Sequence, residues 1–413
     1  MIARGDLKKI GPVLYEIPQT YRSDMRVAAQ FYADHELLEM AVGDRSLEQL
    51  VNTATLPGIF GRALAMPDIH QGYGFPIGGV VATRVPHGVI SPGGVGYDIN
   101  CGVRLLASRL DAAEILPYAD RLADAMYRCV PSGMGVKGNL HVNATELDQI
   151  LSDGSQWARR EGYASSEDVV CTEAGGRMPA ADPDKVSAEA KKRGMGQVGT
   201  LGSGNHFAEV DVITEVFDAA AADALGLRVG QATVQIHCGS RGLGHQVATD
   251  YIQKFQSVSR RYGFELPDRQ LVCAPLDSPE GAGYLAAMNC AANYAWANRQ
   301  VLTHQLRVAF STALHGFVRD PELFVVYDVA HNMAKIETHN VEGRELQLCV
   351  HRKGATRAFG PGHPEVPPQY RQVGQPVLVP GSMGTSSYVL VGTASSMEQT
   401  FGSCCHGAGR VMS

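Results

Sequence analysis

The sequence predicts an α+β protein, built as one large domain over residues 1–413. Three observations lead to this prediction. Runs rich in β-branched residues end at glycine-rich loops, as strands that enter tight turns do. Two long segments carry apolar residues at helical spacing. The strands and helices do not alternate regularly, which favours α+β over a doubly wound parallel sheet, and no internal repeat or low-complexity linker divides the chain.

The first expected elements lie in the middle of the chain. Residues 139–197 are polar, mixed in charge and weakly periodic, so we expect a surface excursion with short helices, one of them at 186–193. The strand at 231–236 then leads directly to His237, and a helix is expected over 245–262.

The longest expected helix spans residues 279–315. Ser278 can cap its N-terminus, and Pro279 suits the first turn, where a backbone N–H is not needed for helical hydrogen bonding.

Strands are expected again toward the end of the chain. The segment 323–329 leads to His331, while 376–379 and 388–391 flank the turn PGSMGTSS as a hairpin. Side chains at strand ends are held by a rigid scaffold, which is a common way to build a functional site.

Composition leads us to expect a soluble cytoplasmic protein. Hydrophobic residues make up 45% of the chain and charged residues 19%. We see no signal peptide and no apolar run long enough to cross a bilayer. The nine cysteines are irregularly spaced, without a CxxC pair, as in proteins of a reducing compartment. The net charge of −6 argues against a broad electrostatic coat of RNA but leaves room for a small basic cleft.

Glycine is unusually frequent, with 46 residues, many of them clustered in loops. Such loops are often tight hairpin turns, but they can also turn backbone N–H groups toward a ligand. Most of these clusters have a histidine, cysteine or aspartate beside them. The clusters are GYGFPIGG (72–79), SPGGVGYDINCG (91–102), GTLGSG (199–204), GSRGLG (239–244), PGSMGTSS (380–387) and HGAG (406–409).

Five residues form a candidate metal constellation. Asp98 and Cys101 lie three apart in one turn, and His206, His237 and His331 each follow or sit inside a tight turn. A thiolate can bridge two ions, so the five residues could hold two ions that share Cys101. Such a pair holds phosphates and stabilises attacking and leaving oxygens. Taken singly, each residue has a simpler interpretation, as a buried cysteine, a turn aspartate or a hydrogen-bonded histidine.

Two glycine-rich loops are candidates for phosphate binding. GSRGLG carries Arg241, and PGSMGTSS carries the hydroxyl of Ser382 with three others. Neither is a Walker motif, so phosphate would be held by backbone N–H groups and arginine forks. The basic run at 351–357, with Arg352 and Lys353, is a candidate contact for the RNA backbone or else a solvated loop.

Asp68 and His406 are harder to assign from their own segments. Asp68 could orient a metal ligand or form an Asx turn, and neighbouring His70 is equally open. His406 lies among small residues, accessible to a bulky electrophile, and Arg410 could neutralise a phosphate. Imidazole is a competent phosphorus nucleophile, although the local pattern alone indicates a metal ligand first.

Eight motifs follow one another along the chain: MPDIHQGYGFPIGG, GGVGYDINCGVR, GTLGSGNHFAE, HCGSRGLGHQV, DVAHNMAK, HRKGATRAF, PGSMGTSSYVL and CHGAGR. As an ordered set they resemble the RNA-splicing ligase RtcB family. The resemblance runs from about residue 60 to the last residue, with a looser match before it. It implies an RtcB-like fold, with mixed and antiparallel sheets and helices around a central metal cleft.

The resemblance also implies a reaction. Family members join a 2′,3′-cyclic phosphate or 3′-phosphate RNA end to a 5′-hydroxyl end, in tRNA splicing or RNA repair. They use GTP and two manganese ions. A histidine takes GMP and passes it to the RNA 3′-phosphate, and the 5′-hydroxyl then displaces it.

The family's residue roles carry over to matching positions. His406 matches the histidine that becomes guanylated, and Asp68 matches a position close to the metals. Asp98, Cys101 and His206 match the ligands of one manganese; Cys101, His237 and His331 match those of the other. The positions that match nucleotide contacts are Asn205, Glu209, Asn332, Ser382, Ala408 and Arg410.

Further expectations concern the metal, the partners and the chain end. By the usual affinity order this ligand set binds zinc or copper more tightly than manganese, so excess zinc should inhibit. The resemblance implies RNA ends and GTP as substrates, a monomer, and in many organisms an activating protein called archease. Relatives generally continue beyond Ser413, with an aromatic residue and a lysine that cover the nucleotide. A chain without them could instead bind RNA 3′-phosphate ends without joining them, or act as a two-metal phosphoesterase.

Overall fold

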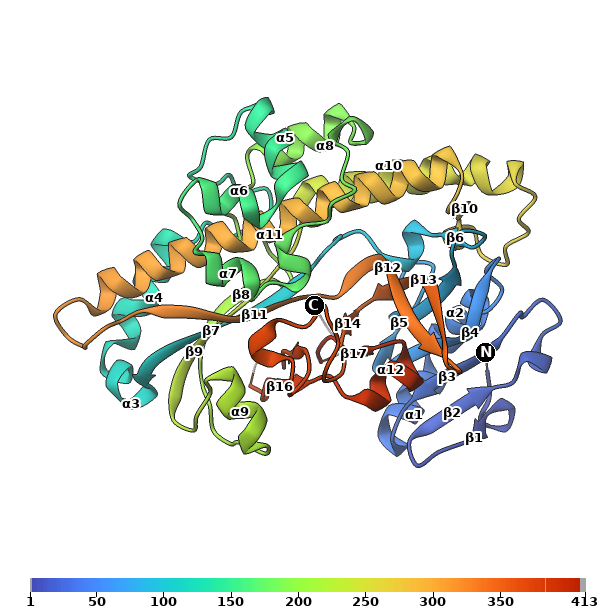
Figure 1. The fold of residues 1–413 in the computed structure, drawn as a ribbon, viewed down its shortest axis with the longest axis horizontal. Helices are drawn as coiled ribbons and strands as arrows, with labels where there is room; N and C mark the ends of the chain where they lie inside the picture. Colours follow the sequence, from blue (N-terminus) through green and yellow to red (C-terminus); the bar gives the residue numbers. More distant parts are fainter. Residues whose placement is uncertain (1, 383, 409–413) are drawn as a thin grey trace.

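The computed structural model describes residues 2–382 and 384–408 and confirms the α+β fold. Figure 1 shows two sheets side by side, with two long helices running across one side of both. The smaller sheet lies on the left of this view and the larger on the right. The candidate metal ligands come from the region where the two sheets meet.

The larger sheet is mostly antiparallel. Among the described residues it has seven strands in the order β1-β2-β3-β4-β5-β13-β12, of which β3 and β4 pair in parallel. The strands are β1 (Lys8–Lys9), β2 (Leu14–Ile17), β3 (Ala28–Tyr32), β4 (Ile59–His70), β5 (Ile77–Arg84), β12 (Asn332–Val341) and β13 (Arg344–Lys353).

The smaller sheet is antiparallel throughout, in the order β11-β7-β9-β8. Its strands are β7 (Gly102–Asp111), β8 (Phe207–Val212), β9 (Gln231–Cys238) and β11 (Leu323–Ala330). Gly102 pairs with both Cys238 and Ala330, so one end of three strands is aligned. Only His331 separates β11 from β12, so the chain passes from the smaller to the larger sheet at this end.

Short ribbons complete the β-structure of the described residues: β6 (Val89–Ile90) with β10 (Ala274–Pro275), β14 (Ala355–Arg357) with β17 (Ser403–Cys405), and β15 (Pro376–Val379) with β16 (Tyr388–Val391). The last ribbon confirms the predicted hairpin. The strands predicted at 231–236 and 323–329 are confirmed as β9 and β11, each slightly longer than expected.

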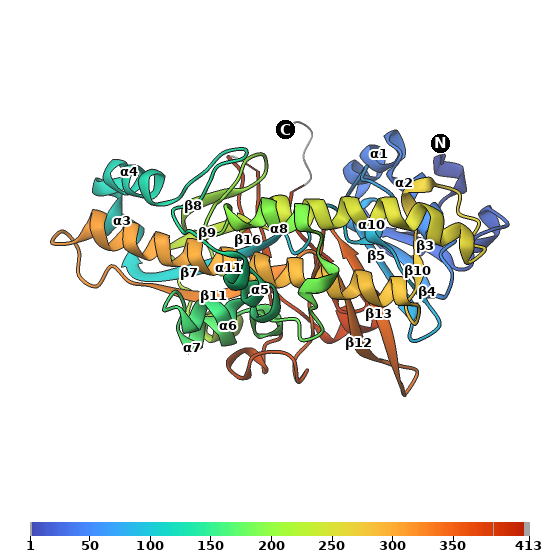
Figure 2. The ribbon, with the colours of Figure 1, turned by 90° about the horizontal axis from the view of Figure 1, so that it is seen from above.

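Two long helices, α10 (Arg241–Arg261) and α11 (Pro279–Leu314), extend along the molecule and pack against each other (Figure 2). The cap of α11 is as predicted, because Ser278 Oγ accepts a hydrogen bond from the N–H of Gly281 at 3.0 Å. Helix α10 begins four residues before its predicted start, because the second half of GSRGLG, with Gly242 and Gly244, lies in its first turn instead of a loop.

The shorter helices surround these elements. They are α1 (His35–Gly43), α2 (Ser46–Thr53), α3 (Ala112–Ile115), α4 (Ala119–Cys129), α5 (Ala144–Asp153), α6 (Ser155–Arg160), α7 (Ser166–Val170), α8 (Ala188–Met195), α9 (Ala219–Leu225) and α12 (Ala394–Thr400). None of the helices in the described part of the chain combines the length and apolar character needed to cross a membrane.

The segment 139–197 forms the short helices α5 to α8, which pack on the body of the protein. Leu147, Ile150 and Trp157 are buried in the same apolar cluster as residues of α10 and α11. Removing such side chains from water stabilises the fold by roughly 1.5–3 kcal/mol each. Helix α8 starts two residues later than predicted, because Ser187 serves as its cap. The segment therefore contributes to the core and is more than a surface excursion.

Candidate functional site

The five candidate metal ligands meet where the two sheets join. Asp98 and Cys101 lie in the turn before β7, which is closed by a hydrogen bond from the N–H of Cys101 to the Asp98 carbonyl (3.0 Å). His237 lies in β9, and His206 directly precedes β8, the neighbouring strand. The backbone N–H of His331 donates to the Cys101 carbonyl (2.9 Å). Strand pairing thus gathers ligands that are far apart in the sequence.

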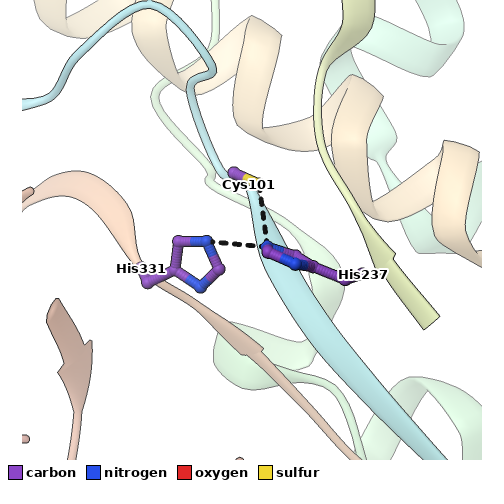
Figure 3. A group of neighbouring side chains, drawn as sticks. All are labelled: Cys101, His237 and His331. Atoms are coloured by element: carbon purple, nitrogen blue, oxygen red, sulfur yellow. Dashed lines mark hydrogen bonds between the residues drawn. The ribbon is translucent and has the colours of Figure 1, made fainter. Parts of the chain in front are cut away.

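These residues form two triads of potential metal ligands that share Cys101. In each triad, one ligand atom per residue lies within 4.8 Å of the others. Cys101 Sγ is 3.4 Å from His206 Nε2 and 3.3 Å from His237 Nε2. In the first triad, His206 Nε2 is 2.8 Å from an Asp98 carboxylate oxygen. In the second, shown in Figure 3, the Nε2 atoms of His237 and His331 are 3.2 Å apart.

The chemistry of the triads suits bound metal ions. Thiolate, imidazole and carboxylate are the usual protein ligands of transition metals. His206 Nδ1 lies 3.1 Å from the Leu201 carbonyl, so it can donate there while Nε2 faces Asp98 and Cys101. Burial by itself would lower the pKa of this ring, but the neighbouring Cys238, Cys101 and Asp98 hold the pKa well above its ordinary value, so a metal ion would have to displace a proton from Nε2. The buried Nδ1 of His331 has no hydrogen-bond partner among the described residues. Hydrogen bonding alone therefore does not explain why this imidazole is buried here.

Burial and mutual charge set the protonation of the cluster. Burial by itself would raise the pKa of Asp98, but His206, Cys101 and His237 lower it to about 2. Burial raises the pKa of the Cys101 thiol to about 12, and the Asp98 charge acts in the same direction. A metal ion would therefore have to displace this proton. Burial, reinforced by neighbouring imidazoles, holds the pKa values of His237 and His331 well below their ordinary value, so both rings are neutral.

His406 lies beside the second triad and is held by Asp68. The pairing of β17 with β14 places His406 so that its ring centroid is 4.8 Å from that of His331. Its Nδ1 is 2.6 Å from Asp68 Oδ2, which also accepts its backbone N–H at 3.1 Å. With the proton on Nδ1, the Nε2 atom keeps its lone pair. His406 belongs to neither triad found among the described residues, contrary to what its local sequence alone indicated.

Asn332 connects the turn that carries Asp98 and Cys101 to the loop beside His406. Its side-chain amide donates to the Asp98 carbonyl (3.0 Å), and its carbonyl oxygen accepts from the N–H of Gly354 (2.8 Å). Gly354 is left-handed (φ 63°), and a Cβ there would clash with Ile77 Cγ2 and lie 3.2 Å from the His406 ring. A glycine is therefore needed at this position for the loop to fit between Ile77 and the histidine.

The PGSMGTSS turn lies next to the segment of His406. The N–H of Ala408 donates to the carbonyl of Pro380 (2.9 Å), which begins this turn. Ser382 is exposed, with its hydroxyl 3.3 Å from that of Thr385. The turn can therefore approach a ligand bound at His406, and its nucleotide role stays a prediction.

The remaining predicted nucleotide contacts lie near β8 or outside the described residues. Asn205 is exposed in the loop before His206, and Glu209 is partly buried in β8. Burial, together with the charge of Asp211, raises the pKa of Glu209 to about 7. Arg410 lies outside the described residues. The roles of these residues stay predictions.

The basic run at 351–357 requires a correction. Arg352 and Lys353 lie in β13 with only 3% of each residue exposed, so they are neither in a solvated loop nor available to an RNA backbone. Arg352 forms a bidentate pair with Glu337 (2.5 and 2.9 Å). The Lys353 ammonium donates to the carbonyls of Tyr73 and Phe75, and burial lowers its pKa to about 7. These partners are distant in sequence, so local composition could not identify them.

Arg241 lies close to the first triad. It is left-handed (φ 54°), and it is the first residue of α10. Its Nε donates to Thr200 Oγ1 (3.1 Å), while the N–H of the preceding Ser240 donates to Asp98 Oδ1 (3.0 Å). Its proposed contact with phosphate stays a prediction.

Arg299 of α11 is an important residue that sequence reasoning missed. It is fully buried, and its Nη1 donates to the carbonyls of Asn100 (2.7 Å) and Cys238 (2.8 Å). Nη2 donates to Asn100 Oδ1 (3.0 Å), and Nη2 and Nε both donate to Asp328 (2.8 Å each). All five guanidinium N–H groups are thus used. Two of the acceptor residues, Asn100 and Cys238, directly adjoin the ligands Cys101 and His237. The sequence signal was a single arginine in the alanine-rich middle of a long helical segment.

Comparisons with known proteins find relatives along nearly the whole chain. The family model described as tRNA-splicing ligase RtcB matches residues 49–413. The tRNA-splicing ligase RtcB of Thermococcus kodakarensis is 54% identical over 407 residues, which cover 98% of this chain and 84% of that protein. The proteins of the same name from Archaeoglobus fulgidus and Methanococcus maripaludis are 52% and 49% identical, over 86% and 85% of their lengths and 100% and 99% of this chain. This chain therefore belongs to the tRNA-splicing ligase RtcB family.

Proposed function

We propose that this chain is an RNA ligase that joins a 2′,3′-cyclic phosphate or 3′-phosphate end to a 5′-hydroxyl end, with GTP as co-substrate and His406 as nucleophile. The observation that carries the proposal is the Asp68–His406 pair beside two ligand triads that share Cys101. The names of the relatives support the same reaction class. Its substrates would be tRNA halves, or other cleaved RNA with the same ends.

Asp68 prepares His406 for attack on phosphorus. Because Nδ1–H is donated to the carboxylate, the Nε2 lone pair is free to attack the α-phosphorus of GTP. The Nε2–P bond forms as the bond to the bridging oxygen breaks, and pyrophosphate leaves with its electron pair. The Asp68 carboxylate stabilises the positive charge that develops on the ring.

The guanylate then moves to RNA. A 3′-phosphate oxygen attacks the phosphorus on His406 and returns the electron pair to Nε2, which leaves an activated 3′ end. The 5′-hydroxyl oxygen then attacks the RNA phosphorus and gives up its proton to water; GMP leaves with the electron pair of the bond to the bridging oxygen, and a phosphodiester remains. A cyclic phosphate would first be opened by water to a 3′-phosphate.

We assign the two triads to two manganese ions. Asp98, Cys101 and His206 would hold one, and His237 and His331 would hold the other together with Cys101. When bound, such ions supply positive charge that neutralises phosphate oxygens. The affinity order favours zinc at these ligands, so manganese loading would reflect supply and open coordination positions.

Further residues and partners complete the proposal. Asn332, which binds Gly354 beside His406, and Ala408, two residues after His406, would contact the guanylate. A monomeric state and an activating partner of the archease type are part of the proposal. The full set of assigned nucleotide contacts is Asn205, Glu209, Asn332, Ser382, Ala408 and Arg410.

Covalent labelling tests this function. We expect the protein with Mn²⁺ and α-labelled GTP to acquire an acid-labile label, as a phosphoramidate is, and the His406→Ala variant to acquire none. His87→Ala is a suitable control, because its side chain is 85% exposed. Equal labelling of His406→Ala and wild type would exclude His406 as the nucleophile. Hydrolysis of cyclic-phosphate RNA without GTP, and without any label on the protein, would instead favour a phosphoesterase.

A further inference from the structure

We propose that Tyr97, His245 and Tyr73 form a stacking strip for the bases of the RNA strand that carries the 5′-hydroxyl. This inference rests on the proposed ligase function and assigns one of its two RNA ends to a surface. The strip begins beside the first triad and ends at a polar cleft. None of its three rings takes part in the chemistry proposed at His406.

The strip is built next to Asp98. Tyr97 directly precedes this ligand, and the Asp98 carboxylate accepts from the N–H of Ser240, the residue before α10. One turn into that helix, the ring of His245 stacks on Tyr97, with centroids 4.8 Å apart and planes 25° apart. The ring of Tyr73 meets the ring of Tyr97 edge-on, with centroids 5.4 Å apart. His245 is exposed, and both tyrosines are partly exposed, so the strip is accessible.

A polar cleft continues the strip. Tyr73 lines a cavity of about 570 Å³, together with Arg45, Gln49, Arg269 and Gln270 and with the carboxylates of Glu48 and Asp268. Both arginines are exposed; Arg45 pairs with Glu48 (3.5 Å), whereas Arg269 has no ion-pair partner among the described residues. A free guanidinium is a suitable partner for a backbone phosphate. Rings next to a cleft with arginines and amides match the chemistry of single-stranded nucleic acid, whose bases stack while its phosphates accept hydrogen bonds.

The proposed chemistry selects the 5′-hydroxyl strand. In phosphoryl transfer the attacking and leaving oxygens are roughly in line across phosphorus. The leaving GMP is delivered from His406, which lies against His331 in the second triad. The attacking 5′-hydroxyl must therefore approach from the other side, where Asp98 and His206 form the first triad. Tyr97 opens the strip at that side.

The test compares three steps of the reaction in His245→Ala, His245→Phe and wild type. We expect the KM for a 5′-hydroxyl oligonucleotide in the joining step to rise about tenfold in His245→Ala, in line with the loss of one stacking contact. His245→Phe keeps a stacking ring, so its KM for the 5′-hydroxyl oligonucleotide should be close to that of wild type. Tyr262→Ala, at the far end of α10, removes a ring that stacks on Phe264 outside the strip and is the matched control.

Measuring guanylation and 3′-end activation separately shows which of the two RNA strands lies on the strip. Guanylation of the protein involves no RNA, and activation of an isolated 3′-phosphate oligonucleotide involves no 5′ strand, so both rates should match wild type in His245→Ala. A slower activation step would place the 3′ strand on the strip and overturn the assignment. An unchanged KM, or no recovery with His245→Phe, would overturn stacking itself.

Direct binding keeps this test independent of the proposed function. Fluorescence anisotropy of a labelled 5′-hydroxyl RNA should show about tenfold weaker binding to His245→Ala than to wild type or Tyr262→Ala. A wild type that forms no guanylate would refute the ligase proposal, whereas equal RNA affinity of His245→Ala and wild type would refute the strip.

Discussion

At the scale of single residues, Asp68 sets the orientation of His406. One of its oxygens binds both Nδ1 and the backbone N–H of the histidine, so it fixes the ring's orientation as well as its tautomer. Asp68→Asn keeps an acceptor oxygen but loses the charge, whereas Asp68→Ala loses both. We expect guanylation to slow by about 10²-fold in Asp68→Asn and by more in Asp68→Ala. Single-turnover labelling with GTP measures both rates.

Metal content separates this role from a general structural one. Asp68 belongs to neither triad, so both variants should bind as much metal as wild type by elemental analysis. A wild-type guanylation rate in Asp68→Ala, or a loss of metal in Asp68→Asn, would contradict the orienting role. Asp68 was ambiguous from the sequence because its partner is 338 residues away along the chain.

At the scale of elements, α11 fixes the ligand loops through Arg299. Lysine offers three N–H donors on one atom in place of five on a planar fork, so Arg299→Lys must leave buried acceptors unpaired. We expect the variant to fold but to bind Co²⁺ about 10–100-fold more weakly, as when partners behind metal ligands are removed. Titration of the cobalt–thiolate absorption band measures this affinity.

Arg307→Lys is the matched control for Arg299→Lys. Arg307 lies on the same helix and also forms a bidentate pair, with Asp168 (2.7 and 2.8 Å), but its contacts are not with segments adjoining the ligands. The stability of Arg307→Lys should fall, while its affinity for cobalt should stay near that of wild type. If the two variants lost cobalt equally, Arg299 would act only through general stability.

Elements with a strong local pattern were predictable, and those set by distant partners were not. Helix α11 and the hairpin of β15 and β16 agree with the sequence, because capping, periodicity and turn residues act locally. Arg352 was misplaced because its partner Glu337 lies on the adjacent strand β12, and only strand pairing reveals it. The ligand triads were grouped through family resemblance; spacing alone does not show that these residues meet.

For the whole molecule, the candidate ligand cluster lies where the two sheets join. Its ligands come from the turn before β7, from the loop before β8, from β9 and from the residue that connects β11 to β12. The unfolded chain has no such preformed site, so metal binding should stabilise the folded state. The fold and the site are therefore coupled: anything that loosens the junction between the sheets should weaken metal binding, and metal should strengthen the junction.

Metal removal tests this coupling. An ion present at 100 times its Kd adds about 2.7 kcal/mol to the stability of the state that binds it. We therefore expect the melting temperature to fall by several degrees after treatment with EDTA, and to recover with Mn²⁺ and, at lower concentration, with Zn²⁺. His406→Ala should show the same shifts, because His406 is in neither triad. Cys101→Ser should respond much less, because it removes the ligand that both triads share. Equal responses of Cys101→Ser and wild type in differential scanning fluorimetry would show that the ions bind elsewhere.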